Sequence, residues 1–171
     1  MDLDAVTFRT IAKQLLPLHS TLSPAEAIAV VQIAELAVGI DLDEDPEEHA
    51  LLQQVKRHVC AIGGISPADV PAVSPLPEPI DTEARHDWCW RLASQLITSG
   101  GRELAYVLAY LVIVGDLELA PVETSLIWDL QHALDISDDR AGFLVERAAE
   151  MVTAYSGPED LPMQGEGAHR I

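Results

Sequence analysis

Acidic side chains occur in two similar short stretches, and each stretch follows a strongly apolar segment. The first reads IDLDEDPEE at residues 40–48, and the second reads GDLELAPVE at residues 115–123. In both, an Asp is followed by a Pro five places on and by a Glu seven places on. Carboxylate oxygens are the ligands that Ca²⁺, Mg²⁺ and Mn²⁺ prefer. One hypothesis is therefore a shared divalent-cation site, with candidate ligands Asp41, Asp43, Glu48, Asp116, Glu118 and Glu123.

The acids at the two ends of each stretch differ in their expected surroundings. Glu48 and Glu123 occupy the third position of a predicted helix, where a carboxylate bonds free backbone amides, so helix capping alone explains them. Asp41 and Asp116 follow a helix C-terminus, where an extra anion costs a few tenths to about 1 kcal/mol. Each Asp either turns outward, caps the next helix through an Asx-type bond, or helps to bind a cation.

An EF-hand calcium loop does not explain the first stretch. Asp41, Asp43 and Asp45 match its first, third and fifth positions. However, the sixth position requires Gly and is Pro46, and the twelfth requires a bidentate Glu and is Leu52.

Histidine and cysteine residues supply weaker candidates. His58 and Cys60 would have to meet Cys89 in space to bind zinc, because neither stretch has paired ligands at the usual spacing. Burial of the Cys and Trp side chains as packing residues is favoured over a zinc site or a Cys–His nucleophile. Glu35 lies in an apolar helical segment and needs a partner, for which Arg91 and Arg102 are candidates, unless it lies at an exposed edge.

Helical signals position these residues, and strand signals are almost absent. Apolar residues recur every three or four places between capping residues, which predicts an all-α fold. Ser23, Pro24 and Glu26 form a capping box that begins a helix, and Asp81 caps another. Gly63–Gly64 and Ser99–Gly101 are expected to end helices. The predicted bundle has about seven helices, including segments near 23–38, 45–60, 81–98, 102–114, 121–134 and 137–155.

An internal repeat relates the two acidic stretches. A shift of 75 positions places Ala34 on Ala109, Leu36 on Leu111 and Pro46 on Pro121. The repeat predicts two pseudo-symmetric helix–acidic turn–helix hairpins, at about 23–66 and 100–137, whose apolar first helices pack together. They form a single domain over 1–155, with a Pro-rich extended connector at 67–80 and a flexible tail at 156–171.

The repeated pattern resembles the TerB-like family, which is named for bacterial tellurite resistance. The resemblance lies in AYLVIVGDLELAPVETSLIWDLQHALDIS (109–137) and in AELAVGIDLDEDPEEHALLQQVKRHVCAIGGIS (34–66), and it covers roughly residues 23–152. Leu42 and Leu117 replace the Gly that usually follows the Asp in that family. The resemblance implies a pseudo-symmetric helical bundle, a metal-binding acidic cluster and a link to stress and resistance systems, without a settled enzymatic activity. The residues that it assigns to the cluster are Asp41, Glu48, Asp116 and Glu123.

Composition limits the possible partners. The formal net charge of −18 disfavours binding to nucleic acids and to anionic membrane surfaces, and favours cations or basic proteins. The N-terminus has no leader-type apolar run, and the longest apolar stretch is too short to span a bilayer, so we expect a cytoplasmic protein. Two non-enzymatic functions follow as hypotheses. One is a stress-response protein that binds a divalent cation through the acidic turns, and the other is an interaction module whose acidic face binds a basic partner without metal.

Overall fold

The described part of this computed structural model comprises residues 22–40, 46–73, 81–114 and 121–155, with the backbone only at 47–48 and 151–155. It contains helices and no strand, which confirms the all-α prediction for these residues. The α-helices are α2 (Pro24–Val38), α3 (Pro46–Gly63), α4 (Thr82–Ala93), α5 (Ser99–Ile113), α6 (Pro121–Ala133) and α7 (Asp138–Tyr155), with one 3-10 helix, η1 (Pro67–Asp69).

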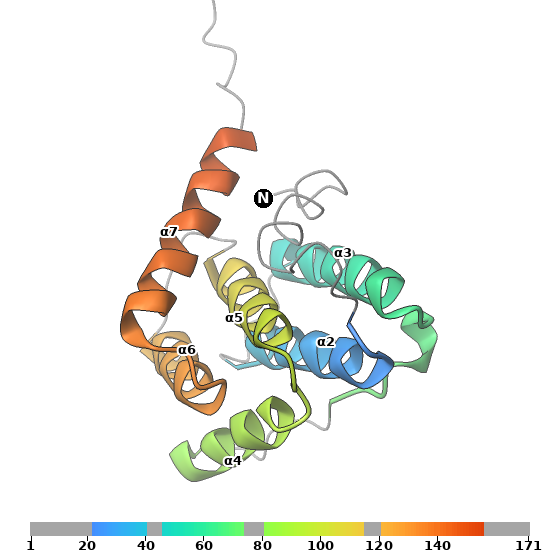
Figure 1. The fold of residues 1–171 in the computed structure, drawn as a ribbon, viewed down its shortest axis with the longest axis horizontal. Coiled ribbons are helices and arrows are strands. Elements are labelled where there is room, and N and C mark those ends of the chain that lie inside the picture. The colour runs from blue at the N-terminus through green and yellow to red at the C-terminus, as the bar shows by residue number, and fades with distance from the viewer. Residues whose placement is uncertain (1–21, 41–45, 74–80, 115–120, 156–171) are drawn as a thin grey trace, which may run out of the picture.

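Helices α2 and α5 form the centre of the bundle. They pack against each other, α3 packs on α2, and α6 and α7 pack on α5, while α4 lies against α6 and α2 (Figure 1). The contact between the helices of residues 27–38 and 102–114 confirms that part of the repeat-based prediction. Ala34, Leu36, Ala109 and Leu111, which were expected at this contact, are all buried in the core.

Helix bounds follow the 75-residue repeat. Helix α2 spans 24–38 and α5 spans 99–113, while α3 begins at 46 and α6 begins at 121. Each pair of bounds differs by 75, so seven residues connect the two helices of each hairpin, 39–45 in the first and 114–120 in the second. The N-caps Ser23 and Thr98 are also 75 apart.

One helix boundary was predicted wrongly. Ser99–Gly101 were expected to end a helix, but they form the first turn of α5, and α4 ends earlier, at Ala93. The Thr98 side chain accepts a hydrogen bond from the Gly101 amide at 3.1 Å and caps the new helix. Gly101 therefore lies in the first turn of a helix, where a Cβ atom would come within 2.9 Å of Thr98 Oγ1.

The end of α3 is determined by two glycines with different roles. Helix α3 continues to Gly63, three residues beyond the predicted end, and Gly64 follows with φ +66. A Cβ atom on Gly63 would lie 2.3 Å from the Cβ of Ala27, so this glycine permits the close approach of α3 to α2. Gly64 has open space around it, and its positive φ is the reason for glycine there.

The connector predicted as extended over 67–80 is not extended throughout. Residues Pro67–Asp69 form the single 3-10 turn η1, because Ser66 accepts a hydrogen bond from the Ala68 amide at 3.3 Å. Residues 71–73 have no regular structure. Residues 74–80 and the predicted tail at 156–171 lie outside the described residues.

Candidate functional site

The predicted cation ligands are mostly beyond the described residues. Asp41, Asp43, Asp116 and Glu118 lie outside them, and Glu48 lies in the first turn of α3 with its side chain undescribed. Glu123 is the third residue of α6 and is 3% exposed, in the position where a carboxylate faces free backbone amides. No group of three or more His, Cys, Asp or Glu side chains in the described segments is arranged to hold a metal ion.

The two cysteines are buried as free thiols. Burial raises the pKa of Cys60, and it raises the pKa of Cys89 to about 12. Both thiols therefore remain protonated near neutral pH, which is unsuited to a nucleophile. His58, Cys60 and Cys89 were considered as possible zinc ligands. The described residues contain no group of side chains arranged to hold a metal ion, so these three do not form one.

Glu35 has a different partner from the two that were predicted. Its Oε1 accepts a hydrogen bond from Lys56 Nζ at 3.1 Å, and its Oε2 accepts one from the Val73 amide at 3.4 Å. Lys56 lies on α3, the neighbour of α2 in the first hairpin. The expected pairing with Arg91 or Arg102 is therefore wrong, because the face of α2 that carries Glu35 lies against α3.

Glu26 has a role that its sequence position does not reveal. Its Oε2 accepts hydrogen bonds from the Ser23 amide and hydroxyl, at 3.1 and 3.0 Å, as the predicted capping box requires. Its Oε1 accepts three more from the start of α5: the Ile97 amide at 3.2 Å, the Thr98 amide at 2.9 Å and the Thr98 hydroxyl at 2.8 Å. One carboxylate therefore closes the N-termini of both central helices.

The surroundings of Glu26 favour its ionised form. Burial alone would raise its pKa, but the hydrogen bonds from Thr98 and Ser23 outweigh burial and lower the pKa from 4.5 to about 2. Gly101, which is 75 positions after Glu26, makes room for this arrangement. A Cβ there would lie 3.2 Å from Glu26 Oε1 and 2.9 Å from Thr98 Oγ1.

Polar and aromatic side chains gather where α4 packs on α6. Arg85 is buried, and its Nε donates to Asp129 Oδ2 at 2.6 Å. Nδ1 of His86 lies 3.7 Å from the other carboxylate oxygen of Asp129. Trp90 Nε1 donates to His86 Nε2 at 2.8 Å, so this hydrogen bond requires a His86 ring without a proton on Nε2.

A second pair of Trp and His side chains lies on α6. The rings of Trp128 and His132 stack with centroids 5.7 Å apart and an interplanar angle of 22°, and His132 Nδ1 bonds the Trp128 carbonyl at 2.8 Å. His132 is three residues after Asp129, and residues three or four apart are neighbours on a helix surface. We call the resulting row the tryptophan strip, and its members are Trp90, His86, Asp129, His132 and Trp128.

Exposure distinguishes the tryptophan strip from ordinary core packing. Trp90 is 50% exposed and Trp128 is 55% exposed. The Cys and Trp side chains of HDWCW were expected to be buried. This prediction is wrong for Trp90 and is confirmed for Cys89. The helical period could have predicted the exposure of Trp90, because the residue directly after an inward-facing Cys89 points about 100° away from the core.

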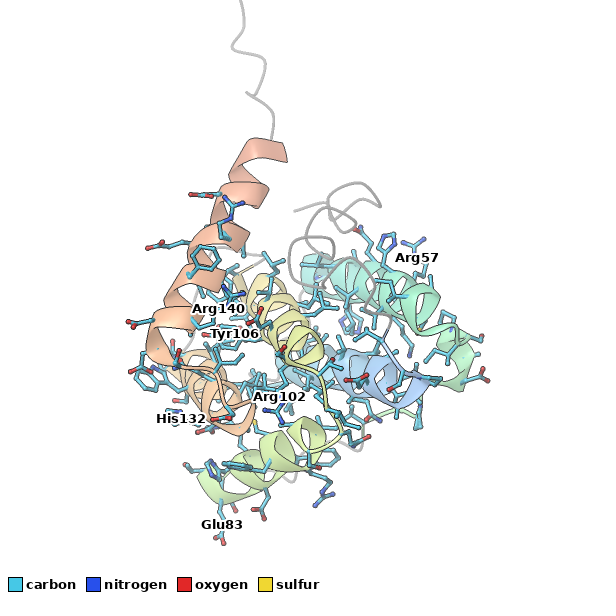
Figure 2. All side chains as sticks on the ribbon, in the orientation of Figure 1. Arg57, Glu83, Arg102, Tyr106, His132 and Arg140 are labelled. Carbon is cyan, nitrogen blue, oxygen red and sulfur yellow. The ribbon has the colours of Figure 1, made fainter. Side chains whose placement is uncertain are left out.

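Most basic side chains of the described segments are paired with acidic ones. Figure 2 shows Arg140 between α7 and α5, where it forms two hydrogen bonds with Glu103, at 2.8 and 2.7 Å. Arg57 and Glu83 project from the outer surfaces of α3 and α4 in the same view. Five of the seven described Lys and Arg residues form ion pairs within the chain, and they are Lys56, Arg85, Arg102, Arg140 and Arg147.

Comparison with known proteins gives no assignment, since no protein-family model, curated protein or solved structure matches this chain. The resemblance to the TerB-like family therefore stays a prediction from the residues that carry it. None of the helices in the described segments combines the length and the apolar character needed to cross a membrane.

Proposed function

We propose that this protein is a non-enzymatic interaction module whose acidic surface binds a basic partner. The supporting observation is the imbalance between free acids and free bases. Most of the described basic side chains are held in internal ion pairs. Seven exposed acids pair with no basic side chain of the described segments, and they are Asp69, Asp81, Glu83, Asp87, Asp138, Asp139 and Glu146.

An uncompensated acidic surface has definite consequences for binding. It attracts a basic partner over several ångströms, accelerates association, and loses this effect as salt screens the charges. It also repels nucleic acids and other acidic proteins.

Fluorescence anisotropy of a labelled peptide tests this proposal. The probe is a nine-residue arginine-rich peptide, and the controls are a peptide in which citrulline replaces every arginine and a glutamate-rich peptide of equal length. We expect saturable one-to-one binding of the basic peptide that weakens by at least tenfold between 50 and 500 mM salt. Equal binding of the citrulline peptide, or no saturable binding of the basic one, contradicts the proposal.

A divalent-cation site is the second candidate function, and the equivalence of the two hairpins supports it. The connections at 39–45 and 114–120 have the same length and join helix pairs that begin 75 residues apart. The predicted ligands Asp41, Asp43, Asp116 and Glu118 lie within these connections, and Glu48 and Glu123 lie in the first turn of the helix that follows each one. The stress-response role implied by the TerB-like resemblance belongs to this second candidate.

Metal-dependent stabilisation tests the second candidate separately. At a cation concentration a hundred times the dissociation constant, binding stabilises the folded state by about 2.7 kcal/mol. We expect millimolar Ca²⁺, Mg²⁺ or Mn²⁺ to raise the melting temperature of the parent but not of the Asp41→Asn, Asp116→Asn double variant. Native mass spectrometry checks the stoichiometry. A parent melting temperature that does not respond to any of the three cations rejects this candidate and leaves the first one standing.

A further inference from the structure

We propose that the tryptophan strip is the docking surface for the basic partner, and that arginine or lysine side chains of that partner stack on Trp90 and Trp128. This inference rests on the proposed function and gives it a location and a chemical mode of recognition.

The tryptophan strip consists of two aromatic pairs on two helices that pack against each other. Trp90 and His86 lie on α4, and Asp129, His132 and Trp128 lie on α6. The 3.7 Å approach of His86 Nδ1 to Asp129 Oδ1 joins the two halves of the strip, and the buried Arg85–Asp129 ion pair fixes α4 against α6 beneath them.

Both indoles are held in place although each is about half exposed. The ring nitrogen of Trp90 donates to His86, and one face of Trp128 is stacked on His132. A side chain that is ordered before binding loses little conformational entropy when a partner arrives. Rigid, half-exposed aromatic side chains of this kind are typical anchors of protein interfaces.

Two other aromatic rings of this chain already have an arginine side chain stacked on them, which is the contact that we expect the partner to make with Trp90 and Trp128. Trp88, on the same helix, has the guanidinium of Arg91 5.0 Å from its ring centroid, and Phe143 on α7 has that of Arg140 at the same distance. Trp90 and Trp128 carry no such cation from the described part of the chain. These two indoles are therefore open to a cation from outside.

The charge around the tryptophan strip selects a basic occupant over a second copy of the chain. Glu83 and Asp87 are exposed on α4, three residues before His86 and Trp90 respectively, and neither forms an ion pair with a described basic residue. A second copy would bring another net charge of −18 to this surface and would be repelled. An arginine or lysine segment is attracted by the acids and stacks on the indoles.

NMR of the full-length parent tests the location without any substitution. The three tryptophan indole N–H signals are followed while the nine-residue arginine-rich peptide is added. We expect the signals of Trp90 and Trp128 to shift and that of Trp88, already covered by Arg91, to stay. Binding of the peptide without movement of either strip signal overturns the inference and leaves the proposed function intact.

Matched substitutions measure the contribution of the indoles. One exposed cation–π contact corresponds to roughly a two- to fivefold change in affinity, so Trp90→Leu with Trp128→Leu should weaken peptide binding about 4- to 25-fold. Phe143→Leu, which removes an exposed aromatic outside the tryptophan strip, should change it less than twofold. Circular dichroism confirms folding of each variant.

Two further outcomes separate this inference from the proposed function. If the parent does not bind the basic peptide at all, the proposed function fails, and the inference fails with it. If the double variant binds the peptide as tightly as the parent, only the inference fails. If sedimentation shows parent dimers that the double variant cannot form, the tryptophan strip holds a second copy, and a basic occupant is refuted.

Discussion

Replacement of Glu26 by Gln should markedly lower the free energy of unfolding, because this carboxylate bonds the starts of both central helices. The pKa of Glu26 falls from 4.5 to about 2 on folding, and one pKa unit corresponds to about 1.4 kcal/mol, so the ionised carboxylate stabilises the fold by about 3 kcal/mol. An amide keeps the shape but replaces one acceptor oxygen with a donor. It therefore leaves backbone amides at the start of α2 or α5 unpaired.

The effect should depend on pH with a defined sign. Because the folded-state pKa of Glu26 is below its unfolded value, the stabilisation is fully present above about pH 4.5 and is lost as the pH falls toward 2. Urea denaturation from pH 7 down to pH 3 measures the free energy of unfolding of the parent and of Glu26→Gln. The difference between them should be about 3 kcal/mol at pH 7 and should shrink steadily below pH 4.5.

Two controls make this prediction specific. Glu146→Gln makes the same chemical change at an exposed position of α7 that has no ion pair with the described basic residues, and it should change stability by less than about 0.5 kcal/mol. Gly101→Ala forces a Cβ toward Glu26 and Thr98, so its effect should be non-additive with that of Glu26→Gln. A stability difference for Glu26→Gln that is below 1 kcal/mol at pH 7, or unchanged at pH 3, would refute the reasoning.

Two other predictions concern the glycines at the end of α3 and the cysteines. Gly63→Ala should lower the free energy of unfolding by about 2 kcal/mol or more, because its Cβ would overlap that of Ala27, whereas Gly64→Ala should lower it by about 1 kcal/mol through its positive φ alone. Urea denaturation checks this order, and a larger loss for Gly64→Ala would contradict the packing argument. Burial raises the pKa of Cys60 and raises that of Cys89 to about 12, so both thiols should react slowly with an aromatic disulfide reagent at pH 8 and rapidly in guanidinium. Fast reaction of either thiol in the native protein would show that it is not buried.

Local sequence signals predicted the helices well where the capping residues lie within one turn. Ser23 with Glu26, Asp81 and Pro121 each mark a helix start that the structure contains. The start of α5 was predicted wrongly because Gly101 was interpreted as a helix terminator. A Cβ there would come close to the Thr98 hydroxyl, three residues before it, and to the Glu26 carboxylate, 75 residues before it, and no local pattern specifies the second of these contacts.

The partners of charged and aromatic residues were harder to predict, because they depend on which helix faces which. Glu35 was identified correctly as needing a partner, but the choice of Lys56 follows from the packing of α3 on α2. Trp90 was identified as noteworthy and interpreted as buried. Its exposure follows from Cys89 pointing inward, which a count along the helix predicts once α4 is known to pack on α6.

The single carboxylate between the central helices makes the two halves of the chain unequal. A protein assembled from two copies of the first half would place a second Glu at position 101, close to the first, so two like charges would meet in a space where one carboxylate now bonds both helix starts. A protein assembled from two copies of the second half would have glycine at both positions and no acceptor for either set of amides. The chain as it stands bonds both helix starts with a single buried carboxylate, and it does so because its two copies have diverged at this position.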